Sequence, residues 1–303
     1  MIEYLLHALP ALGECIPIPD LARVVYILGE HILPPVLQTL LEMAQTSQYN
    51  ATSWCSFFRS TGYRFENLFQ FKLRTAQNGH AFTRCIAATG YLGCLRYAHE
   101  HGCPWDEDTP AYAAAGGHLE CLQYVHENGC LWDGRTCSWA ARQNHLECVR
   151  YAHEHGCPWM RLACLYAAER GHLACLQYAH EHGCPWDVDT PAHAAANGQL
   201  ECLRYAHEHG CPRNTWACSW AAEHGQLECL RYAHEHGFPW DRWTCAWAAE
   251  QGHLECLRYA HENGCPWNED VCALAAATGQ LECLRYAYEQ GCPSRVPPPS
   301  LIN

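Results

Sequence analysis

The stretch Gly252–Trp267, GHLECLRYAHENGCPW, is one copy of a phrase that recurs along most of the chain. Its first cysteine belongs to a series in which each member follows the last by 27 residues. The members of this series are Cys94, Cys121, Cys148, Cys175, Cys202, Cys229, Cys256 and Cys283. A fixed period of this length is typical of tandem repeat architectures. Because Ile86–Gly93 is a degenerate copy of the same phrase, the sequence predicts a repeat array over residues 63–292, with one degenerate unit and eight further units.

Each unit predicts two short antiparallel helices. In residues 190–210, Thr190 is a candidate N-cap and Pro191 suits the first helical position, where its missing N–H costs nothing. A helix over Ala192–Ala196 would end at Gly198, and a second helix would end at Gly210. The apolar side of the second helix comprises Leu200, Cys202, Leu203, Tyr205 and Ala206. Helices this short are not stable alone, so they must stack on neighbouring units as a solenoid.

The same stretch, TPAHAAANGQLECLRYAHEHG, resembles the ankyrin repeat. The matching residues are Thr190, Pro191, His193, Ala194, Ala195, Gly198, Leu200 and Glu201. The units are about six residues shorter than the ~33 of an ankyrin repeat. The resemblance therefore implies an all-α, ankyrin-like helix-turn-helix repeat solenoid without long β-hairpin fingers. The Cys/His/Trp-rich variant is also similar to repeat arrays of giant viruses of amoebae and of some protists.

The two ends of the chain do not share the repeat. Residues 1–62 are predicted to form a helical N-terminal cap, since Leu21–Glu30 and Val36–Ala44 read as amphipathic helices and a solenoid needs its end covered. As an alternative, Ile32–Arg59 resembles an F-box, which docks on ubiquitin-ligase scaffolds. Residues 293–303 are rich in proline and are predicted to be a disordered tail.

The composition excludes several classes of function. A formal net charge of -13 argues against binding nucleic acid or anionic membrane surfaces, which attract basic proteins. No window holds the ~18 uninterrupted apolar residues of a membrane-spanning helix. Glu3 lies where a signal peptide would be basic, so no signal peptide is expected. We therefore predict a cytoplasmic protein, in the host cytoplasm if it is viral.

The 23 cysteines and 21 histidines raise the question of a metal site. Equivalent residues of adjacent repeats are separated by about 8–10 Å, whereas zinc–ligand bonds are about 2.0–2.3 Å long. Phe238 also fills a place that cysteine holds in other units, while Cys229 and Cys245 remain in its own unit. One cysteine is thus replaced while the others of its unit remain, which indicates that the thiols are small buried packing residues and not a shared set of metal ligands. We predict no metal ligands and no cofactor, with zinc binding or disulfides as alternatives.

Nothing in the sequence predicts an enzyme. It has no phosphate-binding loop, no nucleophile elbow and no H-E-x-x-H motif. A nucleophilic cysteine needs a special environment, and thiols that recur in eight units are not special. We therefore name no catalytic residue.

Positions that vary between units are the candidates for partner binding, because the constant positions maintain the fold. Trp, Tyr and Arg predominate in binding hot spots. The candidates are Arg135, Trp139, Arg161, Tyr166, Arg170, Trp216, Trp220, His224, Arg242, Trp243 and Trp247. We predict a protein–protein interaction scaffold that binds an acidic or extended peptide on the concave face of the solenoid. The alternatives are a zinc-binding repeat protein and a substrate-recruiting adaptor of a ubiquitin ligase that docks through residues 1–62.

Two groups of tryptophans have a competing interpretation as packing residues. Trp139, Trp220 and Trp247 could instead fill slots between first helices. A tryptophan of the Cys-Pro-Trp phrase recurs in most units, and we expect it to pack between repeats. The members of this second group are Trp105, Trp132, Trp159, Trp186, Trp240 and Trp267. The sequence does not predict an oligomeric state.

Overall fold

The computed structural model describes residues 76–100 and 102–294. These residues form pairs of short helices joined by tight turns, and they contain no strand. The predicted all-α repeat fold is thereby confirmed. The predicted N-terminal cap at residues 1–62, its F-box alternative and most of the proline-rich tail lie outside the described residues. Among the described residues, every helix is too short or too polar to cross a bilayer.

Each repeat contributes a first helix and a second helix. The first helices are α5 (Ala76–Thr89), α7 (Asp108–Ala115), α9 (Arg135–Arg142), α11 (Leu162–Arg170), α13 (Asp189–Ala196), α15 (Trp216–Glu223), α17 (Arg242–Gln251) and α19 (Glu269–Ala277). The second helices are α6 (Leu92–Glu100), α8 (Leu119–Glu127), α10 (Leu146–Glu154), α12 (Leu173–Glu181), α14 (Leu200–Glu208), α16 (Leu227–Glu235), α18 (Leu254–Glu262) and α20 (Leu281–Glu289). Ile86 lies near the end of α5, so the degenerate copy of the phrase belongs to the same pair as Cys94 in α6.

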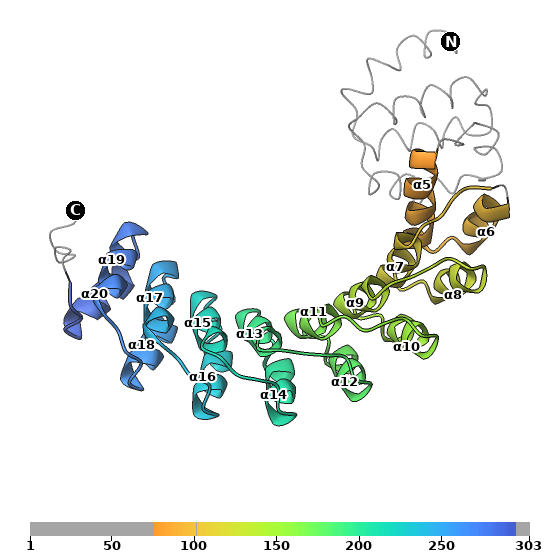
Figure 1. Cartoon of the computed structure of the whole chain (residues 1–303). Coiled ribbons are helices and arrows are strands. Elements are labelled where there is room, and N and C mark those ends of the chain that lie inside the picture. The colour runs from red at the N-terminus through yellow and green to blue at the C-terminus, as the bar shows by residue number, and fades with distance from the viewer. Residues whose placement is uncertain (1–75, 101, 295–303) are drawn as a thin grey trace, which may run out of the picture. The chain divides into compact units, whose positions relative to one another are not determined.

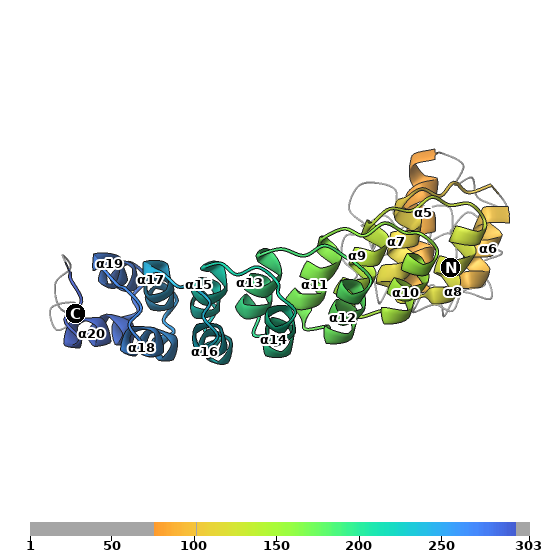
Figure 2. The same ribbon diagram turned by 60° about the horizontal axis from the view of Figure 1, so that its bottom comes forward.

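The helices divide into two compact units, with the boundary between Thr136 and Cys137. In the second unit, α11, α13, α15, α17 and α19 pack side by side as one row (Figure 1). Helices α12, α14, α16, α18 and α20 form a second row, and the view in Figure 2 shows the same two rows. Helices α11, α13, α15, α17 and α19 each also pack on the second helix of their own repeat.

The ends of α13 and α14 show why the chain turns where it does. The Asp189 N–H donates a hydrogen bond of 3.1 Å to Oδ1 of Asp187, so α13 begins earlier than the sequence suggested. The prediction of Thr190 as N-cap is wrong, because Thr190 lies fully buried inside the first turn. The predicted endings are confirmed: Gly198 and Gly210 have φ of +71° and +77°, in the left-handed region that glycine adopts without strain.

The core of each repeat is built from small side chains of the first helix and aliphatic or thiol side chains of the second. In the α13–α14 repeat, Ala194 and Ala195 are fully buried, as are Leu203 and Ala206 of α14. Alanine lets the first helices approach closely, and each fully buried leucine contributes about 2 kcal/mol of hydrophobic stabilisation. The burial therefore depends on neighbouring repeats, as the sequence predicts for helices of this length.

Buried thiols tie successive inter-repeat links together. Cys211 Sγ donates to the backbone carbonyl oxygen of Asp187, one link earlier, over 3.2 Å. The same contact to a residue 24 positions earlier is made by Cys130, Cys184, Cys265 and Cys292. Phe238 holds the corresponding place in its own repeat and is also buried. These cysteines therefore act as small core residues whose thiols form weak hydrogen bonds to link carbonyl oxygens.

The tryptophan of the Cys-Pro-Trp phrase connects one repeat with the next. Trp186 stacks on His180 with ring centroids 3.8 Å apart, and its edge contacts Tyr205 of the next repeat at 6.2 Å. His180 Nδ1 and the Tyr205 hydroxyl share a hydrogen bond of 2.9 Å. Equivalent ring contacts surround Trp105, Trp159, Trp240 and Trp267. The predicted packing role of these tryptophans is confirmed.

Candidate partner-binding site

A column of ring-bearing side chains runs along the first helices of the second unit. Its members, each 27 residues after the last, are Trp139, Tyr166, His193, Trp220 and Trp247. Each ring directly precedes an Ala-Ala pair that is fully buried, whereas the rings themselves are only partly buried. The column therefore borders the solvent-accessible side of the row of first helices.

Four tryptophans meet on α15 and α17. Trp216 and Trp220 are one helical turn apart, with ring centroids separated by 5.7 Å. Trp243 and Trp247 repeat the arrangement in α17, also at 5.7 Å. The two helices are joined by Trp216 and Trp247, whose rings stack at 5.8 Å with an interplanar angle of 13°. We call these four residues the tryptophan cluster.

The tryptophan cluster is extended at two edges. His193 of α13 contacts the Trp220 ring edge-on, with centroids 5.2 Å apart. At the other edge, the Arg242 guanidinium carbon lies 5.0 Å from the centroid of the Trp243 ring, within the range of a cation–π contact. His224 is exposed beside the cluster, with Nδ1 2.9 Å from the Trp220 carbonyl oxygen.

The tryptophan cluster is open to a ligand. Trp216 is 42% exposed, and the other three indoles are partly exposed. None of the four indole N–H groups meets a hydrogen-bond acceptor among the described residues. A buried indole N–H usually finds a partner, so a chain laid over the cluster could supply carbonyl oxygens to these donors.

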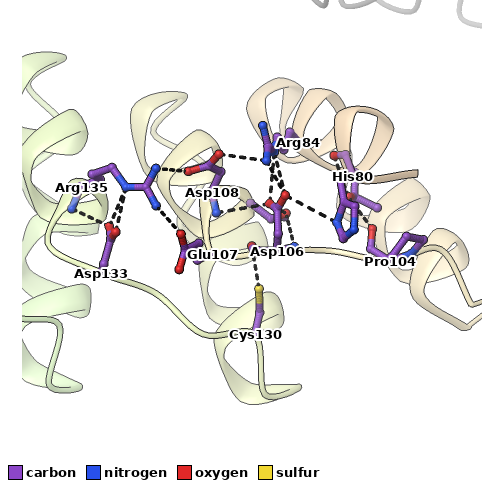
Figure 3. Close-up of polar contacts among 11 residues, drawn as sticks. His80, Arg84, Pro104, Asp106, Glu107, Asp108, Cys130, Asp133 and Arg135 are labelled. Atoms are coloured by element: carbon purple, nitrogen blue, oxygen red, sulfur yellow. Dashed lines mark hydrogen bonds and ion pairs between the residues drawn. The ribbon is translucent and has the colours of Figure 1, made fainter. Parts of the chain in front are cut away.

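Arg135, in contrast, is held by neighbouring carboxylates (Figure 3). Its guanidinium lies 3.0 Å from Glu107 and 2.8 Å from Asp133, and it also pairs with Asp108. Asp108 is in turn 2.9 Å from Arg84. Arg135 therefore belongs to a chain of alternating charges along the first unit, and its positive charge is matched within the protein.

Two other predicted arginines, Arg161 and Arg170, also pair with carboxylates. Arg161 Nη1 lies 2.8 Å from Asp187 and 3.2 Å from Asp189, and Arg170 Nε lies 3.4 Å from Glu169. Tyr166 is likewise covered on one face, because the guanidinium carbon of Arg142 lies 5.1 Å from its ring centroid. Trp139 is partly exposed and lies outside the tryptophan cluster. Three of the four predicted arginines thus already face carboxylates of the same chain, whereas Arg242 lies over the Trp243 ring.

The structure brings three residues to this surface that the sequence-based set did not include. They are His193, Glu223 and Glu250. His193 could have been predicted from the sequence, because it lies 27 residues from both Tyr166 and Trp220. Glu223 and Glu250 each stand three residues after a column tryptophan, on the same side of the helix.

The cysteines and histidines do not gather into a metal site within the described residues. No group of three or more His, Cys, Asp or Glu side chains there could hold an ion. The 21 described cysteines are free thiols, and burial raises the pKa of Cys175 to about 11 and that of Cys211 to about 12. Buried, protonated thiols are poor ligands and poor nucleophiles.

Comparison with known proteins agrees with this geometry. A family model described as ankyrin repeats (3 copies) matches residues 137–215 and again residues 164–242. Residues 137–242 thus contain ankyrin repeats. Ankyrin repeats are generic protein–protein interaction modules and typically serve as non-enzymatic binding scaffolds.

A solved structure supports the ankyrin fold beyond the residues that the family model matches. The crystal structure of the human ASB11 ankyrin repeat domain aligns with a TM-score of 0.50 and 18% sequence identity. The alignment covers 58% of this chain and 95% of that chain. At this identity the likeness concerns the fold alone. A search of curated proteins found no match to the chain.

Proposed function

We propose that this chain is a protein-binding scaffold whose partner is an extended polypeptide segment laid across α13, α15 and α17. The observation that carries the proposal is the tryptophan cluster, in which four indoles from two successive repeats form one partly exposed surface. Tryptophan is the residue type most enriched in binding hot spots. In a repeat protein, the residues that differ between repeats define the ligand, and Trp216 and Trp243 are such residues.

A packing role accounts for only part of this surface. Trp220 and Trp247 pack against neighbouring first-helix side chains, as expected for slot-filling residues. Trp216, however, leaves a large apolar area in water, and packing alone leaves four indole N–H groups without an acceptor among the described residues. An extended segment would cover the rings and could place backbone carbonyl oxygens near these donors.

The proposal is tested with a random library of displayed 12-residue peptides selected on the full chain. We expect enriched peptides whose affinity falls at least about tenfold when Trp216→Ala and Trp243→Ala are combined, since hot-spot truncations cost more than ~1.4 kcal/mol. Tyr91→Ala is the matched control, because Tyr91 is 43% exposed but lies in the other unit. Unchanged binding by the double variant, or no enrichment on the wild-type chain, would contradict the proposal.

A further inference from the structure

The tryptophan cluster continues into two carboxylates. In α15, Trp216, Trp220 and Glu223 follow one another at i, i+4 and i+7, which places them on one stripe of the helix. Helix α17 packs directly beside α15 and carries the same stripe one period later. Its members are Trp243, Trp247 and Glu250. The surface is therefore aromatic at the start of the two helices and acidic at their ends.

No described residue neutralises these two carboxylates. Glu223 and Glu250 are partly exposed, and neither forms an ion pair with a described residue. Glu169, which holds the equivalent place in α11, is in contrast 3.4 Å from Arg170 and 3.9 Å from His193. The pairing seen at Glu169 in α11 is thus not repeated at Glu223 in α15 or at Glu250 in α17.

Other charged groups around the tryptophan cluster do not offset the negative charge of Glu223 and Glu250. Arg242 is the basic residue in contact with the cluster, and its guanidinium lies over the Trp243 ring. Asp241 precedes it and accepts the backbone N–H of Trp243 at 2.9 Å. His193 and His224 also border the surface. The whole chain has a formal net charge of -13, so a basic ligand is attracted over long range.

We propose that the tryptophan cluster takes a basic side chain, a lysine or arginine of the partner's extended segment. This inference rests on the proposed function and specifies its ligand. The methylene groups of such a side chain cover the indole rings, and its charged end reaches Glu223 and Glu250. Arg242 on Trp243 is an example of the same ring–cation contact within the protein.

The test compares the peptides selected by three forms of the full chain at ~0.15 M ionic strength, where long-range attraction is screened. The forms are the wild type, a Glu223→Gln, Glu250→Gln variant and a Glu228→Gln, Glu255→Gln variant. The Glu228→Gln, Glu255→Gln variant is the matched control, because Glu228 and Glu255 are exposed on the second helices α16 and α18. It removes the same two negative charges from the chain as the Glu223→Gln, Glu250→Gln variant does.

We expect the wild type and the control to enrich peptides with lysine or arginine at one position. The Glu223→Gln, Glu250→Gln variant should lose this preference and bind a selected basic peptide about tenfold more weakly. Peptides that bind in a Trp216- and Trp243-dependent manner without a basic residue would overturn the inference and leave the proposed function standing. Equal binding of a basic peptide by all three forms would also overturn it. If no peptide binds the cluster, both proposals fail.

Discussion

The hydroxyl of Tyr232 lies 3.0 Å from Nδ1 of His207 in the preceding repeat, and this hydrogen bond joins two second helices. The His207 ring also faces His236, with centroids 5.2 Å apart. Burial lowers the pKa of His207, and the nearby His236 and Arg213 lower it further, against a smaller opposite effect of Glu208. The interface between repeats is therefore built for a neutral imidazole.

From this arrangement we predict that the repeat array loses stability in mild acid. Burial and a neighbouring histidine also lower the pKa of His153 and of His180. A group whose pKa is lower in the folded state stabilises the fold above its unfolded pKa, here about 6.5, and this contribution is lost as the pH falls through the folded pKa. Thermal unfolding should show a Tm several degrees lower at pH 5 than at pH 7.5. A His180→Gln, His207→Gln variant should show a shallower dependence, and a constant Tm would refute the prediction.

A second prediction separates two roles of glycine. Gly225 and Gly210 both have positive φ, +70° and +77°. A Cβ at Gly225 would lie 2.7 Å from Nδ1 of His253 in the next repeat, whereas a Cβ at Gly210 would meet nothing within 4 Å. Gly210→Ala should cost only the ~1–2 kcal/mol of a left-handed residue, and Gly225→Ala should cost more. Equal urea midpoints for the two variants would show that the contact with His253 is unimportant.

A third prediction concerns the order in which the described thiols react. Cys94 and Cys103 are partly exposed, whereas the remaining described cysteines are buried. Burial raises the pKa of Cys175 to about 11, while a hydrogen bond with Cys292 lowers that of the fully buried Cys272 to about 7. Because alkylation needs both a thiolate and access, maleimide at pH 7.5 should label Cys94 and Cys103 first, as mapped by mass spectrometry. Labelling of Cys175 at the same rate would contradict the described burial.

The fold could be predicted from the 27-residue period together with the residues inside each unit, since Pro191 near a helix start and Gly198 and Gly210 after helix ends divide the unit into two short helices and a link. Helix starts were less certain. Asp187 and Thr190 are both good N-cap residues three positions apart, and the sequence does not say which one the backbone uses. In the structure α13 begins at Asp189, whose N–H donates to the Asp187 carboxylate, and Thr190 is buried in the first turn.

The candidate site could be predicted only in part. The period identifies Trp220 and Trp247 as equivalent, but it does not show that Trp216 stacks across the helix boundary on Trp247, because ring orientation depends on local packing. Arg161 pairs with Asp187 of the following link, and both residues can be read from the sequence. The sequence alone does not show, however, whether an arginine pairs with a carboxylate of the next repeat or stays free.

A fourth prediction contrasts two arginines that both pair with carboxylates. Arg84 contacts Asp106 and Asp108 in the half-buried network of the first unit. Burial raises the Asp106 pKa, but the hydrogen bond and charge of Arg84, together with His80 and Thr109, lower it more, so the net shift is downward. Arg161 is more exposed, with 53% of its side chain in solvent. Arg84→Ala should lower the free energy of unfolding by about 1–2 kcal/mol, and Arg161→Ala by at most about 0.5 kcal/mol, in urea titrations of the full chain. The reverse order would contradict this account.

The most direct test of the central claim, that the tryptophan cluster binds the partner, uses the chain with its 12 tryptophans replaced by 5-fluorotryptophan. The fluorine resonances are assigned by single Trp→Phe substitutions and followed while a selected peptide is added. We predict that the resonances of Trp216, Trp220, Trp243 and Trp247 shift together, while those of the Cys-Pro-Trp residues, such as Trp186 and Trp267, stay in place. Shifts confined to the Cys-Pro-Trp residues, or a saturating peptide that moves none of the four, would contradict it.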